Sequence, residues 1–221
     1  MARSLPGLLA GAFMYPFRGT TVMWLVAVLV ATTFLQFIPL VGGLVALSAE
    51  LGFLFAVLRS TAGGADTLRI DARDIADVSL WLAPLGKYVM AMAVSFAPAV
   101  VAAVLLGDAS GAVSPVVYGA GAVGLLYFPA ALVVAAHSQG CLGALNPLAG
   151  IALIGKIPGA YVLTVFFVAI ALGVGGGMLR AAAAIEVPLL GAIVRSVAAL
   201  YAPVVAMRLL GLLLAENAEH L

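Results

Sequence analysis

Long apolar runs alternate with short polar breaks along the chain, and most of the runs approach or exceed the length that a membrane-spanning helix needs. Such a helix takes about 20 predominantly apolar residues. The predicted spans cover residues 20–37, 44–58, 82–106, 116–136, 160–179 and 189–214. The pattern therefore predicts an all-α fold, a polytopic transmembrane helical bundle of about six spans within a single transmembrane domain, 1–221. A seventh span or a re-entrant variant is the alternative.

Two other apolar stretches are too short or too interrupted to span. Residues 5–18 contain Pro6 and Pro16, and residues 137–159 are rich in glycine and proline. We expect the first to lie as an interfacial helix, and the second to be an interfacial or a re-entrant segment. The long polar segment 60–79 is expected to form a loop with a short surface helix.

Composition supports a lipid environment and narrows the partners. Hydrophobic residues make up 65% of the chain and charged residues 9%, whereas a soluble domain carries about 25% charged residues. The net charge of +1 argues against a nucleic-acid partner. The expected partners are membrane lipids, together with a second copy of the chain or another membrane protein packed on faces of small residues. A single cysteine, Cys141, rules out an internal disulfide.

The basic residues are distributed unequally between the two sides that six spans would define. Eight fall on one side: Arg3, Arg18, Arg59, Arg69, Arg73, Lys87, Lys156 and Arg208. The other side receives Arg180 and Arg195. Because cytoplasmic loops carry the excess of basic residues, we expect both termini to be cytoplasmic.

A segment near the N-terminus resembles one near the C-terminus. Without a gap, residues 38–59 align with residues 187–208 at seven identical positions. These are Pro39/Pro188, Leu40/Leu189, Gly42/Gly191, Val45/Val194, Ala49/Ala198, Leu51/Leu200 and Arg59/Arg208. A chain with such an apolar composition would give roughly two or three identical positions by chance. The alignment predicts a parallel internal duplication, with repeat unit one at 5–59, a central helical pair at 80–137 and repeat unit two at 146–208. Alternatively, proline and glycine simply recur where membrane helices begin.

Glu50 is an acidic residue in the middle of a predicted span, where an isolated carboxylate costs several kcal/mol. The duplication places Arg195 about one helical turn from the depth of Glu50, so we hypothesise a buried ion pair between them. Such a pair could fix the register of two helices, or it could serve as a proton or substrate site. In a third alternative, Glu50 is protonated and hydrogen-bonded to a neighbouring hydroxyl.

Other polar residues fit structural roles better than chemistry. His137 and Cys141 share a helical spacing, but further metal ligands at suitable spacing are missing. We expect His137, Ser138, Gln139 and Asn146 to form a polar cluster that caps helix ends at the interface. The aspartates of the polar loop lack the spacing of a calcium site. The sequence thus predicts no catalytic residue, no metal and no cofactor.

Several short motifs carry a family resemblance. They include Tyr15-Pro16-Phe17-Arg18 before the first span, Ile38-Pro39-Leu40-Val41-Gly42 in the turn, and a Gly-Ala-Asp loop after Val57-Leu58-Arg59. Phe128-Pro129-Ala130, Leu145-Asn146-Pro147 and Lys156-Ile157-Pro158 follow. Together they resemble an uncharacterised prokaryotic family of integral-membrane proteins, a domain of unknown function loosely similar to Yip-type membrane domains. The resemblance implies about six helices, no assigned chemistry and a place in the bacterial inner membrane.

Three classes of function are compatible with these patterns. The first, which we favour, is a non-enzymatic membrane-embedded scaffold or partner-binding protein. The second is a small-solute or lipid transporter, or a membrane subunit of one, that uses the pair Glu50 and Arg195. The third, an intramembrane enzyme, is disfavoured because such enzymes cluster Asp, His or Glu near one membrane face, and here these residues are scattered.

Overall fold

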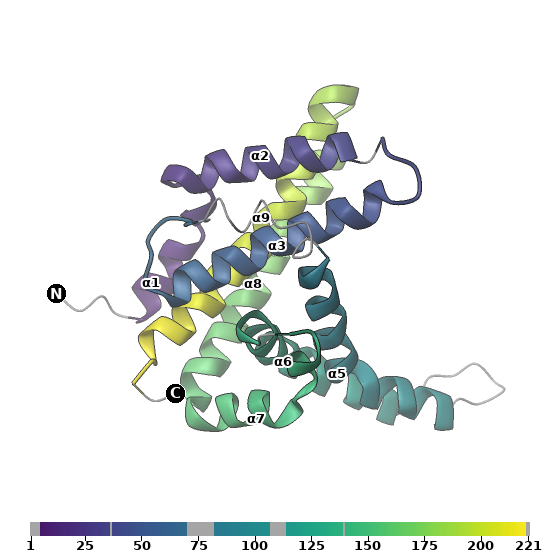
Figure 1. Cartoon of the computed structure of the whole chain (residues 1–221), viewed down its shortest axis with the longest axis vertical. Coiled ribbons are helices and arrows are strands. Elements are labelled where there is room, and N and C mark those ends of the chain that lie inside the picture. The colour runs from purple at the N-terminus through teal and green to yellow at the C-terminus, as the bar shows by residue number, and fades with distance from the viewer. Residues whose placement is uncertain (1–4, 36, 70–81, 107–113, 139, 220–221) are drawn as a thin grey trace. The chain divides into compact units, whose positions relative to one another are not determined.

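The computed structural model describes residues 5–35, 37–69, 82–106, 114–138 and 140–219. Every regular element in these ranges is helical (Figure 1). The elements group into two compact units, Met1–Pro84 with Gly159–Leu221, and Leu85–Pro158. The prediction of an all-α helical fold is confirmed. A short surface helix is expected within 60–79, and residues 70–79 of that segment lie outside the described residues.

Within the described residues, five helices are long and apolar enough to cross a membrane. They are α3 (Gly42–Ala62), α5 (Ala83–Leu106), α6 (Pro115–His137), α8 (Pro158–Ala183) and α9 (Pro188–Glu216). A sixth apolar helix, α2 (Gly19–Leu35), has 17 residues, or about 26 Å at 1.5 Å per residue, which is shorter than the roughly 30 Å hydrocarbon core. These helices indicate a multi-pass membrane protein.

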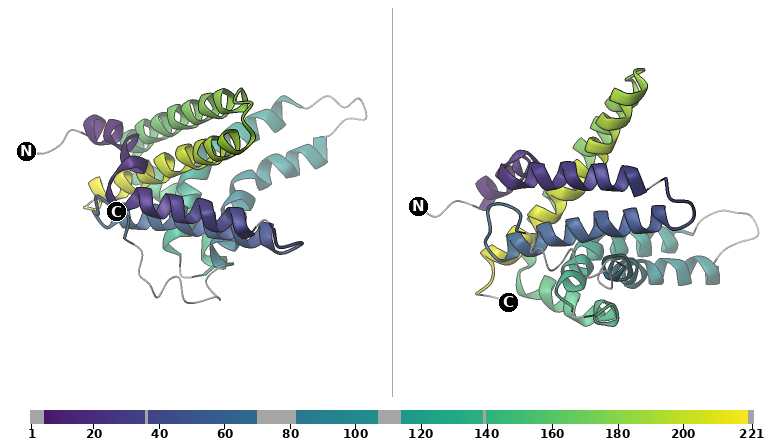
Figure 2. Two further views of the ribbon diagram at one scale, coloured as in Figure 1. Left: turned by 90° about the horizontal axis from the view of Figure 1, so that it is seen from above. Right: turned by 45° about the horizontal axis from the view of Figure 1, so that its top comes forward.

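The first unit contains α1 (Leu5–Ala12), the short 3-10 helix η1 (Tyr15–Phe17), α2, α3, α8 and α9. In this unit α3 packs along α9, and α2 packs on α3. α1 and η1 lie against α9 (Figure 2). α3 and α9 approach each other closely at Gly211, where an added Cβ would lie 2.7 Å from the carbonyl oxygen of Leu58 and would collide with Thr61. α8 approaches α9 at Gly175, where an added Cβ would collide with Ala202. Glycines therefore allow these helices to pack closely.

The end of α3 is set by a hydrogen-bonded glycine turn. Gly64 has φ +77°, in the left-handed region that favours glycine. The backbone N–H of Ala65 donates to Ser60 O (2.9 Å), and that of Gly64 donates to Thr61 O (2.9 Å). This is the Schellman arrangement that closes helix C-termini. The following residues are fixed as well, because the hydroxyl of Thr20 donates to Leu68 O (3.2 Å).

The second unit contains α5, α6, the 3-10 helix η3 (Leu142–Leu145) and α7 (Pro147–Lys156). Phe128 of α6 contacts two aromatic rings of α5, Tyr88 at 5.8 Å and Phe96 at 5.9 Å between centroids. The hydroxyl of Tyr127 donates to Pro147 O (3.0 Å), which ties α6 to the start of α7. The order of a short helix followed by two longer ones thus occurs twice in the chain, at α1–α2–α3 and at α7–α8–α9. The duplication itself, with units 5–59 and 146–208 around the pair 80–137, stays a prediction.

Candidate functional site

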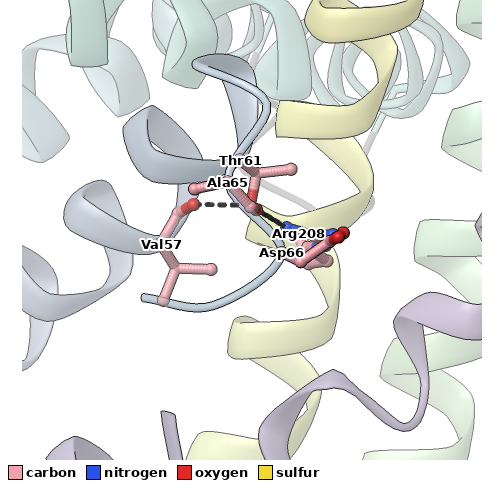
Figure 3. Close-up of polar contacts among 5 residues, drawn as sticks. All are labelled: Val57, Thr61, Ala65, Asp66 and Arg208. Atoms are coloured by element: carbon pink, nitrogen blue, oxygen red, sulfur yellow. Dashed lines mark hydrogen bonds and ion pairs between the residues drawn. The ribbon is translucent and has the colours of Figure 1, made fainter. Parts of the chain in front are cut away.

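The most connected polar site in the described part of the chain is centred on Arg208, in the C-terminal half of α9. Its exposed fraction is 8%, although it is an arginine within an apolar run. Nη1 donates to the Thr61 hydroxyl (3.0 Å) and to Ala65 O (2.6 Å), as Figure 3 shows. The Thr61 hydroxyl donates in turn to Val57 O (2.8 Å). Both N–H groups of Nη1 are therefore used at the C-terminal end of α3.

Arg208 also complements the electrostatics of that helix end. The last carbonyl groups of a helix carry partial negative charge, so a cation near them is stabilised. The guanidinium of Arg208 donates to Ala65 O, in the turn just beyond that helix end, and so links α9 to the turn that ends α3. Nη2 makes a longer contact, 3.5 Å to the Asp66 carboxylate, whose side chain is 84% exposed. An ion pair so open to water contributes little, so the bonds to Thr61 and Ala65 position the guanidinium.

The side chain of Tyr15 covers the guanidinium. Arg208 Cζ lies 4.5 Å from the centroid of the Tyr15 ring, a distance typical of a cation–π contact. Tyr15 has an exposed fraction of 1%, and its hydroxyl has no hydrogen-bond partner among the described residues. Burial raises the pKa of this phenol above its usual value, and the nearby Thr21 hydroxyl and the charge of Arg208 counteract part of that rise. Tyr15 is therefore held neutral against the arginine.

Neighbouring contacts hold η1 on α9. The hydroxyl of Tyr201 donates to Phe13 O (3.0 Å), and the rings of Tyr201 and Phe17 lie 5.9 Å apart. Arg208 contacts both Tyr15 and Ala65, so the motif Tyr15-Pro16-Phe17-Arg18 lies beside the turn Gly64-Ala65-Asp66, which is far away in the sequence. Two of the motifs that carry the family resemblance thus meet at one site.

A pocket opens next to this cluster. Its volume is about 210 Å³. Its walls come from α1, η1, the turn after α3, and α9, and the lining residues are Gly7, Leu8, Gly11, Ala12, Tyr15, Arg18, Asp66, Arg208 and Leu212. All of these residues belong to the first unit.

Glu50 and Arg195, predicted from the sequence to pair, have different surroundings. Glu50 is half-buried in the middle of α3 and interacts with the hydroxyl of Thr32 on α2. That hydroxyl donates to Leu29 O (3.3 Å) within its own helix. Arg195 is exposed, and its guanidinium lies against Gly191 of its own helix. Between these two described residues there is no ion pair, and their pairing stays a prediction.

Two described members of the predicted polar cluster, Ser138 and Asn146, cap helix ends. Ser138 is the C-cap of α6, and its hydroxyl donates to Ala135 O (2.9 Å). Asn146 Oδ1 accepts a hydrogen bond from Leu148 N (3.1 Å) and so caps the start of α7, the role expected of it. His137 is exposed at the end of α6, with Nδ1 3.0 Å from Val133 O. Gln139 lies outside the described residues. Lys87 Nζ donates to Ser138 O (2.6 Å), which joins α5 to the end of α6.

Sequence reasoning missed the role of Arg208, which entered only as one of the seven identities of the internal alignment and as a cytoplasmic charge. The signal was present, because Arg208 lies between Met207 and the run Leu209-Leu210-Gly211-Leu212, and an arginine inside an apolar helix requires partners. Comparison with family models, with curated proteins and with solved structures finds no match to the chain.

Proposed function

We propose that the chain is a non-enzymatic, membrane-embedded scaffold or partner-binding protein. The observation that carries the proposal is the use of polar side chains inside the helices. The hydroxyls of Thr61, Ser95 and Thr164 each donate to a carbonyl oxygen four residues earlier in the same helix, at 2.8–2.9 Å. Arg208 is used to join α9 to α3. Polar groups engaged in this way support helix packing and leave the outward faces for recognition.

α8 presents such an outward face. Val162, Phe166 and Ile170 follow one another at intervals of four residues, with exposed fractions of 66%, 60% and 39%. Residues four apart lie on one side of a helix, so these side chains form a continuous apolar stripe. The opposite side of the helix holds Val168, whose exposed fraction is only 8%. A stripe of this kind suits either lipid or the helix of a membrane partner.

Photo-crosslinking in native membranes tests the proposal. A photoreactive residue in place of Phe166 should give a protein adduct of one discrete mass, and the same residue at the buried Val168 is the matched control. If Phe166 gives only lipid adducts, the partner-binding role is wrong.

The alternative, a small-solute or lipid transporter, is supported by one observation. Glu50, in the middle of α3, is half-buried and lies near Thr32 of α2. Purified protein in proteoliposomes should show no proton-coupled flux if the scaffold proposal is correct. Flux that disappears in Glu50→Gln and persists in Arg59→Gln would establish transport instead.

The proposal includes a cellular place. The unequal distribution of basic residues supports cytoplasmic termini, and the motif resemblance supports the bacterial inner membrane and the uncharacterised prokaryotic family. Cysteine-labelling of Ala218→Cys in the Cys141→Ser background, in intact cells and in inverted vesicles, tests the orientation. Labelling from outside intact cells by an impermeant reagent would contradict it.

A further inference from the structure

The pocket beside Arg208 combines cationic groups with free volume. Its volume of about 210 Å³ is smaller than the roughly 300–1,000 Å³ of pockets that enclose a drug-sized ligand. Space of this size suits a compact polar group. Two arginines, Arg18 and Arg208, contribute to its walls.

The charges in the pocket are unbalanced. Arg18 and Arg208 line the same pocket, so two positive charges share its walls. One carboxylate, Asp66, lines the same space, and it is 84% exposed and 3.5 Å from Nη2 of Arg208. Two cations against one loosely held carboxylate leave a net positive charge, which an anion between the arginines would neutralise.

One of the two arginines is already held in place. Hydrogen bonds to Thr61 and Ala65 fix Nη1 of Arg208, and the Tyr15 ring covers the guanidinium plane. Nη2 has only the long contact to Asp66 among the described residues. A guanidinium fixed in this way loses little further freedom when it binds an oxyanion, and its planar fork matches phosphate oxygens.

Residues of α1 form part of the pocket wall. Gly11 lines the pocket, and an added Cβ there would meet no atom within 4 Å. Arg18 at the end of η1 is exposed and stands at the rim, with a backbone hydrogen bond from its N–H to Tyr15 O (3.1 Å). The pocket therefore combines a glycine in its wall with a buried cation, Arg208, and an exposed cation, Arg18.

We propose that this pocket binds a phosphate-class oxyanion between Arg18 and Arg208, with Asp66 displaced towards water. In the proposed orientation the site faces the cytoplasmic leaflet, where anionic phospholipids concentrate. The same chemistry would accept the phosphodiester of an anionic lipid headgroup or a free phosphate. The inference goes beyond partner binding and does not depend on it.

Binding of phosphatidylglycerol to the purified full-length protein tests the proposal. Native mass spectrometry from detergent would compare phosphatidylglycerol with phosphatidylcholine, and thermal unfolding would follow titration with inorganic phosphate. Arg18→Gln should weaken binding of the effective probe about tenfold, since a charge-assisted hydrogen bond contributes about 1.5 kcal/mol and 1.4 kcal/mol is tenfold. Arg18→Lys should keep most of the affinity.

Gly11→Leu is an independent test, because its side chain would occupy the pocket without clashing at Cβ and leaves both arginines in place. We expect it to abolish binding. The matched controls are Arg59→Gln, another exposed arginine near a helix end, and Gly177→Leu, where an added Cβ also meets no atom within 4 Å. Both should bind as the parent protein does.

The source of the oxyanion follows from the two probes. If the protein keeps phosphatidylglycerol bound in the presence of inorganic phosphate, and binds it more tightly than phosphatidylcholine, the ligand is a lipid headgroup. Stabilisation by inorganic phosphate that also displaces the lipid indicates a soluble phosphate. The proposal is overturned if the parent protein binds neither probe, or if Arg18→Gln and Gly11→Leu bind as well as their controls.

Discussion

The guanidinium of Arg208 lies 4.5 Å from the centroid of the Tyr15 ring, so side chains from opposite ends of the chain stack on each other. Both are buried in the first unit, and Arg208 extends from there to the turn that ends α3. A single arginine thus joins α9 to the N-terminal segment and to α3. This relationship explains why the Tyr-Pro segment packs on α9, and three predictions follow from it.

Arg208→Gln should lower the free energy of unfolding by about 3 kcal/mol, because it removes charged hydrogen bonds and leaves Ala65 O without its buried donor. Arg208→Lys should recover only part of this loss, since an ammonium lacks the planar fork. SDS or thermal unfolding in detergent micelles measures the effect. The control is Arg59→Gln, at an exposed position, which should stay within about 0.5 kcal/mol. Equal effects of the two glutamine variants would contradict the central role of Arg208.

Tyr15→Phe should leave stability at neutral pH unchanged or slightly higher, because the buried hydroxyl has no hydrogen-bond partner and the ring is kept. Tyr15→Leu removes the ring that covers Arg208 and should cost about 1 to 2 kcal/mol. The unfolding free energies of the two variants, compared with that of the parent protein, measure these effects. A larger loss in Tyr15→Phe than in Tyr15→Leu would show that the hydroxyl, not the ring, matters.

The raised pKa of Tyr15 also predicts a pH effect. Between the usual pKa of about 10 and the raised pKa in the fold, the unfolded chain has released the phenolic proton and the folded protein has kept it. The folded state then binds more protons, so stability falls as pH rises through that window, and the contribution is complete below pH 10. Unfolding measured from pH 9 upward should show a weaker decline in Tyr15→Phe than in the parent protein. Parallel declines would contradict the shift.

Gly211→Ala should destabilise the protein by about 1 to 3 kcal/mol, because the new methyl group would collide with Thr61 and approach Leu58 O at the contact between α9 and α3. Gly177→Ala is the control. Its added methyl group meets no atom within 4 Å, and alanine favours a helix over glycine by about 1 kcal/mol. Opposite signs for the two substitutions in the same unfolding assay are the expected result. Similar small effects would show that α3 and α9 are not in tight contact there.

Double-mutant cycles separate the partners of Glu50. If the Thr32 hydroxyl bonds to a protonated Glu50, Thr32→Val should cost about 1 kcal/mol and should couple to substitution of Glu50 by leucine. Glu50→Gln, which stays neutral and polar, should change stability little. A second cycle with Arg195→Met measures the predicted ion pair. Coupling above about 0.5 kcal/mol there would favour the pair, and coupling confined to Thr32 would contradict it.

The helices were largely predictable. The predicted span 116–136 corresponds to α6, Pro115–His137, and the predicted span 189–214 corresponds to α9, Pro188–Glu216. Such agreement has a local cause, because apolar length, helix-starting prolines and terminal glycines act within a few residues of the position they determine. The positions of helix ends are less certain by the same means. α3 extends to Ala62 rather than to residue 58, because the Schellman turn at Gly64 ends it.

The candidate site was not predictable by these means. Sequence reasoning selected Glu50 for its depth and counted Arg208 only among the basic residues of the cytoplasmic side, whereas the structure buries Arg208 and exposes Arg195. Periodicity reports which residues are apolar within one helix, but it carries no information on which helices become neighbours. An alignment of repeats predicts equivalent positions, and it does not place Tyr15 over Arg208.

The apolar pattern by itself determined that this chain folds into helices and nearly where each long one begins, although α2, one of the six predicted spans, is shorter than the hydrocarbon core. It could do so because a helix satisfies its own backbone hydrogen bonds, so its formation in lipid depends on local composition. Tertiary structure alone decided that Arg208, Tyr15, Thr61 and Ala65 meet, and that a pocket with Arg18 at its rim lies beside them. These contacts join residues far apart in the chain through the packing of α9 against α3 and η1, which no local pattern specifies.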